Sequence, residues 1–330
     1  TDDCDVSYLM EKAREASGKV YGKDIYIRGL IEISNYCRNN CYYCGIRRGN
    51  DRAERYRLTM AEIRECIDYG YQLGFRTFVL QGGEDAALTD DFLTEIIGAV
   101  KTQYDDCAIT LSIGERTYDS YVRLYDAGAD RYLLRHETAD SGHYGKLHPA
   151  DMSYDNRIKC LMQLKEIGYQ TGCGMMIGSP YQTIDNIIED IRLIERLKPH
   201  MVGLGPFIPH KDTQFADYAE GSAALTLKIM SVIRIMQPDV LLPSTTALET
   251  IVGDAHKTGI LAGCNVIMPN LSPEHAKEKY MLYNNKAVSG SEDASGLSVL
   301  RANMESIGYN IVTGRGDCKR PGVKGMLQDV

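Results

Sequence analysis

Eight short apolar segments, separated by longer amphipathic stretches, recur through most of this 330-residue sequence. They are rich in Val, Ile and Leu, as parallel strands buried on both faces should be. Strands are predicted over residues 29–35, 77–81, 108–113, 131–136, 170–177, 201–207, 240–245 and 265–268. Helices are predicted between them over 60–73, 91–101, 117–127, 154–167, 183–197 and 225–236. This alternation predicts an α/β fold, a (βα)8 TIM barrel.

Local signals mark where several of these helices begin and end. Thr59 and Thr183 are predicted N-caps, and Glu62 completes a capping box with Thr59. A left-handed cap is expected after three helices, at Gly74, Gly128 and Gly168. We expect three parts: a helical extension over residues 1–24, the barrel over 25–270, and a C-terminal extension over 271–330 that closes the barrel.

Composition narrows the class of protein. Hydrophobic residues make up 44% of the chain and charged residues 25%, which is typical of a soluble globular protein. The net charge of −8 argues against a broad nucleic-acid surface, and no apolar run approaches the roughly 18 residues that span a bilayer. Apart from one trio, the ten cysteines form no close group, which is typical of a reducing compartment. We therefore expect a cytoplasmic protein with no signal peptide, membrane segment or nucleic-acid partner.

The trio, Cys37, Cys41 and Cys44, follows the first predicted strand with the spacing C-x3-C-x2-C. Thiolates favour zinc or iron–sulfur clusters as metal centres. A cubane cluster needs four ligands, so three cysteines would leave one iron with an open coordination position. A structural zinc site is the alternative. Such a site usually combines one close pair of cysteines with a second, distant pair of ligands, and the sequence has no second cysteine pair. The spacing favours a cluster.

Five arginines follow this trio closely: Arg47, Arg48, Arg52, Arg55 and Arg57. The simpler interpretation is a solvated loop, because charged runs usually face water. The alternative is that some of these arginines bind an anionic substrate or guide an electron donor.

The barrel prediction places chemistry at the carboxyl ends of the strands. Gly82, Gly83 and Glu84 end the second predicted strand, where the glycines let the backbone approach a ligand. On the third strand Thr110 and Ser112 alternate and share a face. Their hydroxyls either line the cavity or satisfy the backbone of the barrel wall.

The fourth predicted strand ends in two charged residues that also share a face, Arg135 and Glu137. Burying both charges would require partners. They recognise a ligand, with Arg157 as a second guanidinium, or they form a plain salt bridge with each other. His136 points the other way and is predicted to be structural.

With Tyr43 before its last cysteine, the motif is similar to that of the radical S-adenosylmethionine (SAM) superfamily. The resemblance implies a [4Fe-4S] cluster on the three cysteines, SAM on its fourth iron, and Tyr43 against the adenine. It implies that the SAM amino group lies at Gly82, Gly83 and Glu84. Further cofactor contacts are expected from Ser112, Glu137, Arg157, Met176, Met201, Tyr280 and Tyr283. The strand holding Met176 departs from the family pattern, because Tyr181 stands where a glutamate is usual.

A narrower resemblance, over about residues 25–283, is to the radical SAM maturases of [FeFe]-hydrogenase, and the run 131–139 (RYLLRHETA) carries it most specifically. It implies reductive cleavage of SAM to a 5′-deoxyadenosyl radical, and a small organometallic iron substrate bearing CO, cyanide and cysteine. We hypothesise that the radical acts on the sulfur side of this cysteine. Implied partners are an electron donor such as a ferredoxin or flavodoxin, and other hydrogenase maturases. The substrate would contact Thr110, Arg135, Thr245, Thr246 and Met268.

Three other functions stay open at this stage. A methylornithine synthase shares the barrel and the Arg55–Arg57 run but would rearrange lysine. A biotin synthase would need a second cluster, for which Cys173 has no evident partners; the tail offers only Cys318, so no C-terminal cluster is expected. A cluster carrier would bind iron without cleaving SAM.

Overall fold

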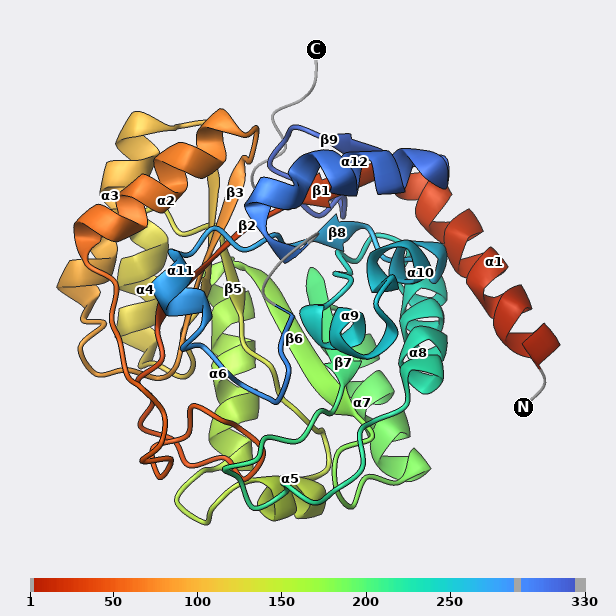
Figure 1. The fold of residues 1–330 in the computed structure, drawn as a ribbon, viewed down its shortest axis with the longest axis horizontal. Helices are drawn as coiled ribbons and strands as arrows, with labels where there is room; N and C mark the ends of the chain where they lie inside the picture. The colour runs from red at the N-terminus through yellow and green to blue at the C-terminus, as the bar shows by residue number, and fades with distance from the viewer. Residues whose placement is uncertain (1–2, 288–291, 324–330) are drawn as a thin grey trace.

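In the computed structural model, which describes residues 3–287 and 292–323, parallel strands form a barrel surrounded by helices (Figure 1). Six strands pair in chain order in one sheet. They are β2 (Gly29–Ser34), β3 (Thr77–Gly82), β4 (Ala108–Ser112), β5 (Arg131–Leu133), β6 (Gln170–Ile177) and β7 (Met201–Pro206). A second sheet has the order β8-β1-β9, with β1 at Asp24–Ile27, β8 at Val266–Ile267 and β9 at Asn310–Val312.

The barrel closes through the segment that joins these two sheets. β1 and β2 are two halves of one chain segment, and β1 pairs with β8 while β2 pairs with β3. Between them, the Arg28 N–H donates to the Ile267 carbonyl at 2.9 Å, which continues the ladder. The expected strand 240–245 is wrong as a continuous strand: it makes two single bridges, Met201 with Leu241 and Pro243 with Val266. Pro243 has no N–H to donate, so a longer ladder cannot form there.

The six predicted helices are present, with ends displaced by at most two residues and with both ends of 154–167 matched. They are α2 (Met60–Gln72), α3 (Asp90–Gln103), α4 (Tyr118–Asp126), α6 (Tyr154–Ile167), α7 (Ile184–Leu197) and α8 (Ala223–Met236). Thr59 and Glu62 form the predicted capping box, and Gly168 caps α6 with φ of 109°. α1 (Asp3–Tyr21) packs on α8, outside the barrel (Figure 1). None of the helices in the described residues is long and apolar enough to cross a membrane.

Helices that the sequence did not predict are mostly short: α5 (Ser141–Leu147), α9 (Thr246–Val252), α10 (Ala255–Leu261), α11 (Glu274–Lys277), a 3-10 turn (Ala294–Gly296) and α12 (Leu297–Ser306). Segments of one or two turns carry little periodicity, so the pattern cannot separate them from loops. Two of them, α9 and α10, lie between the barrel segment 240–245 and β8.

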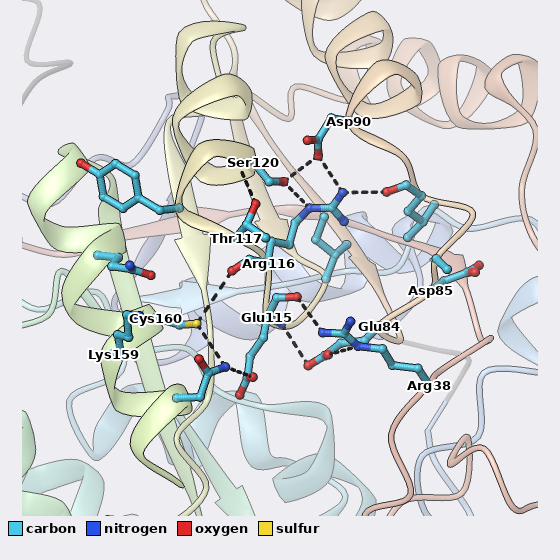
Figure 2. A pocket seen from close by; sticks show the side chains of 16 residues that line it. Arg38, Glu84, Asp85, Asp90, Glu115, Arg116, Thr117, Ser120, Lys159 and Cys160 are labelled. Carbon is cyan, nitrogen blue, oxygen red and sulfur yellow. Dashed lines mark hydrogen bonds and ion pairs between the residues drawn. The ribbon is translucent and has the colours of Figure 1, made fainter. Parts of the chain in front are cut away.

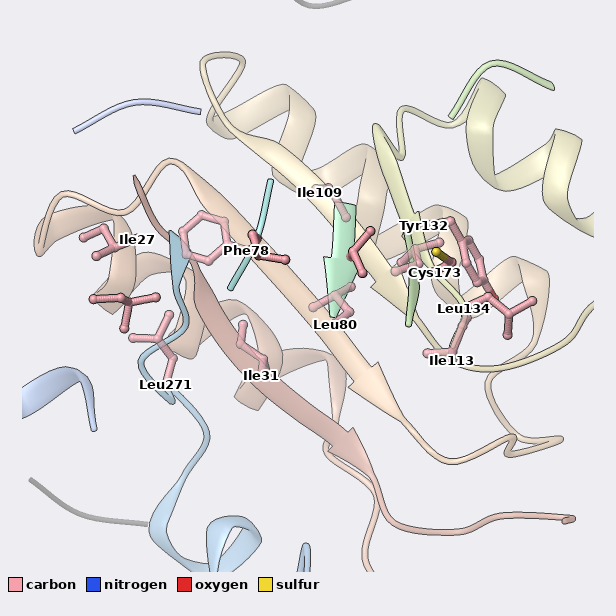
Figure 3. Close-up of a cluster of buried hydrophobic side chains, with 14 of the residues drawn as sticks. Ile27, Ile31, Phe78, Leu80, Ile109, Ile113, Tyr132, Leu134, Cys173 and Leu271 are labelled. Carbon is pink, nitrogen blue, oxygen red and sulfur yellow. The ribbon is translucent and has the colours of Figure 1, made fainter. Parts of the chain in front are cut away.

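The hydrophobic core lies between the strands and the outer helices (Figure 3). Ile31 on β2 and Leu111 on β4 belong to this buried cluster, whereas their neighbours Leu30 and Thr110 line the inside of the barrel. Successive strand residues point to opposite faces, so every second residue is directed inward. The strands therefore hold the polar residues at their ends against a common interior.

The C-terminal segment covers the amino ends of the strands. Asp317 pairs with Arg131, which starts β5 and is fully buried, at 2.5 Å, and with Arg315 at 2.9 Å. Farther along, Arg320 pairs with Asp239 at 2.7 Å. Of the expected parts, residues 1–2, 288–291 and 324–330 lie outside the described residues. Within the described part, residues 310–323 of the extension lie at this end, whereas residues 279–284 lie beside the cysteine loop, where the Gly45 N–H donates to the Leu282 carbonyl at 2.8 Å.

Candidate active site

The cysteine trio lies in a loop after β2 that the Arg55 side chain holds together. Its guanidinium donates to four backbone carbonyls, those of Asn35, Ile46, Arg47 and Asn50, at 2.5–3.2 Å. A loop without regular structure needs such donors for its carbonyl groups. The expectation of a solvated basic loop is therefore wrong for Arg55. Arg57 pairs with Asp85 at 2.6 Å, but its side chain stays 43% exposed, in agreement with a solvated position.

The three thiols line one cavity inside the barrel. Burial, together with the neighbouring Cys37, raises the pKa of Cys44 to about 12. Burial also raises the pKa of Cys41 and Cys37. Three such thiols stay protonated alone but become thiolates when a cation binds them. This donor set fits an iron–sulfur cluster.

The cavity has a volume of about 340 Å³ and is lined from every side of the barrel. All of the residues predicted as site residues line it, from the cysteines and Tyr43 at the carboxyl ends of the strands to Met201 at the amino end of β7. The residues between these extremes are Gly82, Gly83, Glu84, Thr110, Ser112, Arg135, Glu137, Arg157, Met176, Thr245, Thr246, Met268, Tyr280 and Tyr283. From the sequence, Met201 was expected among the cofactor contacts near the cysteines. Its place at the start of β7 puts it on the deep wall.

Close backbone packing explains the glycines at the end of β3. A Cβ on Gly83 would lie 2.2 Å from the Tyr36 carbonyl oxygen and 2.7 Å from the Cys37 Cβ. The following Glu84 accepts from the Arg38 guanidinium and the Glu115 N–H, both at 3.0 Å. The run therefore holds the cysteine loop against β3 and presents an oriented carboxylate beside it.

Arg157 is a buried cation that two carboxylates and a carbonyl hold in place. Its Nε donates to Glu115, its Nη1 donates to the Arg135 carbonyl at 2.7 Å, and its Nη2 lies 3.7 Å from Glu84. Burial lowers the pKa of Arg157, but Glu115, Tyr144 and Glu84 together outweigh burial, and the pKa is raised. Glu115 escaped the sequence analysis because it lies in a loop after β4, without a motif.

Arg135 and Glu137 both line the cavity, and their charged groups lie next to each other. The Arg135 Nη2 lies 3.2 Å from a Glu137 oxygen and also donates to the Met175 carbonyl at 2.7 Å. The salt-bridge interpretation therefore describes part of this pair. The Nε atom of Arg135 and the Oε2 atom of Glu137 have no hydrogen-bond partner among the described residues. Glu137 has φ of 66°, a left-handed conformation that is uncommon outside glycine and often found at functional sites.

His148 and Gln182 orient the groups at the end of the cavity where the adenine of SAM is expected. The Tyr43 hydroxyl lies 3.1 Å from Nε2 of His148, whose Nδ1 lies 3.0 Å from the Tyr144 carbonyl. Burial lowers the pKa of His148 to about 3, so the ring is neutral and can accept from Tyr43. Gln182 bonds the Met176 carbonyl and the Gly178 N–H, whereas Tyr181 bonds Tyr218 outside the cavity.

The deep end of the cavity holds a buried cation that the sequence analysis missed. Arg28 is 4% exposed, and its Nη1 donates to the Met201 sulfur at 3.0 Å. Its Nε and Nη2, and the Thr110 hydroxyl, have no partner within the described part of the chain. Burial, followed by the Arg131 charge, lowers the pKa of Arg28 to about 9, so it is still charged at neutral pH. These donors can bind an anion.

A larger polar cleft of about 610 Å³ opens beside the cavity and shares Glu84 with it (Figure 2). Figure 2 shows Arg116 bonded to Asp90 and Ser120, and Arg38 bonded to Glu84. The cysteine trio does not line this cleft. The inner cavity is therefore the better candidate for the reaction.

Comparisons with known proteins agree with this geometry. A family model described as the Radical SAM superfamily matches residues 31–194. The chain is 43% identical over 300 residues to the [FeFe] hydrogenase maturase subunit HydE of Thermotoga maritima, covering 91% of this chain and 85% of the relative. It is 30% identical over 278 residues to the 3-methylornithine synthase of Methanosarcina barkeri, covering 84% and 78%. The crystal structure of the methylornithine synthase PylB has a TM-score of 0.79 at 25% identity, covering 94% of this chain and 90% of the other.

Proposed function

Because the chain belongs to the radical SAM superfamily and is more similar to HydE than to the methylornithine synthases, we propose that it is a hydrogenase maturase of the HydE type. The family implies an iron–sulfur cluster and SAM. One observation carries the proposal: the three thiols and all the residues expected around SAM and substrate line a single cavity.

We propose that Cys37, Cys41 and Cys44 hold a [4Fe-4S] cluster, which together with SAM supplies a 5′-deoxyadenosyl radical. Glu84 would bind the SAM amino group, and Arg157 with Glu137 its charged and hydroxyl groups. The Tyr43 ring, held by His148, would pack on the adenine. Further cofactor contacts are proposed for Gly82, Gly83, Ser112, Met176, Tyr280 and Tyr283. A dry barrel interior would keep reactive species from water.

The deep half of the cavity would bind the substrate. Arg28 and Thr110 offer unpaired donors there, and Arg135 offers its Nε. Such donors fit a small anion, which an iron species bearing cyanide and cysteine would be. Thr245, Thr246 and Met268 would complete this wall. The C-terminal extension would close the base of the barrel below it.

Electrons would enter from a ferredoxin- or flavodoxin-type donor. Arg48 and Arg52 near the cysteine loop have 60% and 82% exposed side chains and offer it a basic contact. Other hydrogenase maturases are proposed as further partners.

A methylornithine synthase is the second candidate, because that relative is 30% identical and PylB shares the fold. A biotin synthase is less favoured, since among the described cysteines only the trio lines the cavity and Cys173 is buried in the core.

The proposal is tested by anaerobic reconstitution of the cluster, followed by reductant, SAM and measurement of 5′-deoxyadenosine. We expect cleavage in the parent protein and none in Cys41→Ala, while Cys66→Ala, a buried cysteine on α2, retains it. Cluster binding without cleavage would favour a carrier. Cleavage that converts lysine to methylornithine would replace the maturase proposal.

A further inference from the structure

Three side chains from separate segments converge behind one wall of the cavity: Glu249 on α9, His256 on α10 and Glu292, which lies just before the 3-10 turn. Their ligand-type atoms all lie within 4.8 Å of one another. His256 and Glu292 are each only 4% exposed. None of these residues takes part in the function proposed above.

Two of these groups lack the hydrogen bonds that buried polar atoms normally make. His256 Nε2 lies 2.7 Å from Glu292 Oε1, but neither atom has a hydrogen-bond partner of acceptable geometry among residues 3–287 and 292–323. The same holds for His256 Nδ1. Buried polar atoms are nearly always paired, so these atoms require an explanation. A protonated imidazole would form an ion pair with Glu292 at this distance, whereas a neutral imidazole would direct a lone pair toward the carboxylate, as two ligands of one shared cation do.

Neighbouring contacts hold the two carboxylates in position. Glu249 Oε2 accepts from the backbone N–H groups of Ala255 and His256, at 2.7 and 3.3 Å. Glu292 Oε2 accepts from the Thr246 hydroxyl. Metal ligands are commonly fixed by such outer contacts.

The charge balance also favours a cation. Two carboxylates surround one imidazole, and the charges that act on His256 come from Glu292, Glu249 and Asp254, all acidic. The nearby lysines are engaged elsewhere: Lys257 lies 3.7 Å from Asp254, and Lys286 pairs with Glu32. Buried carboxylates are costly unless paired or bound to metal.

We propose that Glu249, His256 and Glu292 bind one divalent transition-metal cation, with zinc as its probe. One imidazole and two carboxylates are ligands that zinc accepts. The bound ion would tie α9 and α10 to the chain around Glu292. Through Thr246, which lines the cavity and bonds Glu292, it would also fix one part of the cavity wall. Its role is structural.

The test uses the untagged chain of residues 1–330 carrying Cys37→Ala, Cys41→Ala and Cys44→Ala, so that the trio cannot bind the added metal. After chelation and dialysis, Zn²⁺ is titrated by calorimetry, and Co²⁺ is titrated by its visible absorption. We expect one ion per chain and at least a 100-fold weaker affinity in His256→Gln and Glu292→Gln. His275→Gln, a change at a half-exposed histidine 3.5 Å from Glu62, should bind as the parent does.

Folding is checked in the same samples by circular dichroism and thermal unfolding. Zn²⁺ should raise the unfolding midpoint of the parent but not of Glu292→Gln, since a ligand of the folded state stabilises it. Glu249→Gln, at a partly exposed site whose amide oxygen can still accept the backbone N–H groups, provides a second variant should the buried ones misfold. Absence of stoichiometric binding, or equal binding in the parent and Glu249→Gln, would overturn the proposal in favour of a plain buried His–Glu contact.

Discussion

Replacing Asp317 with Asn should weaken the closure of the barrel base in a pH-dependent way. Asp317 is a largely buried carboxylate between Arg131 and Arg315, and Gln170 also donates to it at 2.7 Å. Burial would raise the pKa of Asp317, but the charges of Arg131 and Arg315 outweigh it and lower the pKa from 3.8 to about 2. The carboxylate therefore favours the folded state.

The size of this contribution follows from the shift. A pKa lowered from 3.8 to about 2 corresponds to about 2 kcal/mol of unfolding free energy at neutral pH, at roughly 1.4 kcal/mol per pKa unit. Because the folded-state pKa is depressed, the contribution is complete above the unfolded pKa and is lost as pH falls through the folded pKa. By pH 3 it should have dropped to about 1 kcal/mol.

The assay is urea unfolding of the parent and of Asp317→Asn at several pH values between 7 and 3, with far-UV circular dichroism as the measure of unfolding. The difference between them should be constant from pH 7 to about 5 and then shrink. Asp91→Asn is the control, because Asp91 is 83% exposed and its pair with Arg123 should contribute little. An equal difference at pH 7 and pH 3, or no difference at pH 7, would refute this account of the base.

Two further predictions concern the cavity. Gly83→Ala should lower the iron bound per chain by more than half and abolish SAM cleavage, because its Cβ would overlap the Tyr36 carbonyl oxygen. Gly82→Ala, whose Cβ meets the Ser34 oxygen at 3.2 Å, should retain more iron; equal loss in both variants would contradict this explanation. Glu115→Gln should weaken SAM binding at least tenfold, about 1.4 kcal/mol, because the buried Arg157 loses its main counter-charge. Equilibrium binding measures this, with exposed Glu278→Gln as the control, and unchanged affinity in Glu115→Gln would argue against a role for Arg157 at SAM.

Much of the fold could be predicted because its signals are local. Periodicity located six helices that follow strands of the barrel, and Thr59 with Glu62 marked a helix start that the structure confirms. The α/β barrel class was also predicted correctly, and the comparisons support the superfamily. Strand alternation explains why Thr110, Ser112 and Arg135 point to one interior. The roles proposed for these residues are still predictions that the measurements above test.

Other features depend on contacts between segments far apart in the chain. Arg28 and Met201 meet across 173 positions, and Arg131 with Asp317 across 186. Glu115 was missed because its importance comes from Arg157, 42 residues later. Neither periodicity nor motif spacing records such distances.

The sequence by itself determined the alternation of barrel strands and longer helices, the spacing of the three cysteines and the inward face of each strand. These follow from side-chain chemistry and from periods of two or 3.6 residues, which neighbouring positions specify. Only the tertiary structure decided that the segment 240–245 closes the barrel through single bridges, that the C-terminal segment covers its base, and that Glu249, His256 and Glu292 meet. The physical reason is that closing the barrel brings together distant backbone and charged groups, whose burial is then set by packing and not by their sequence neighbours.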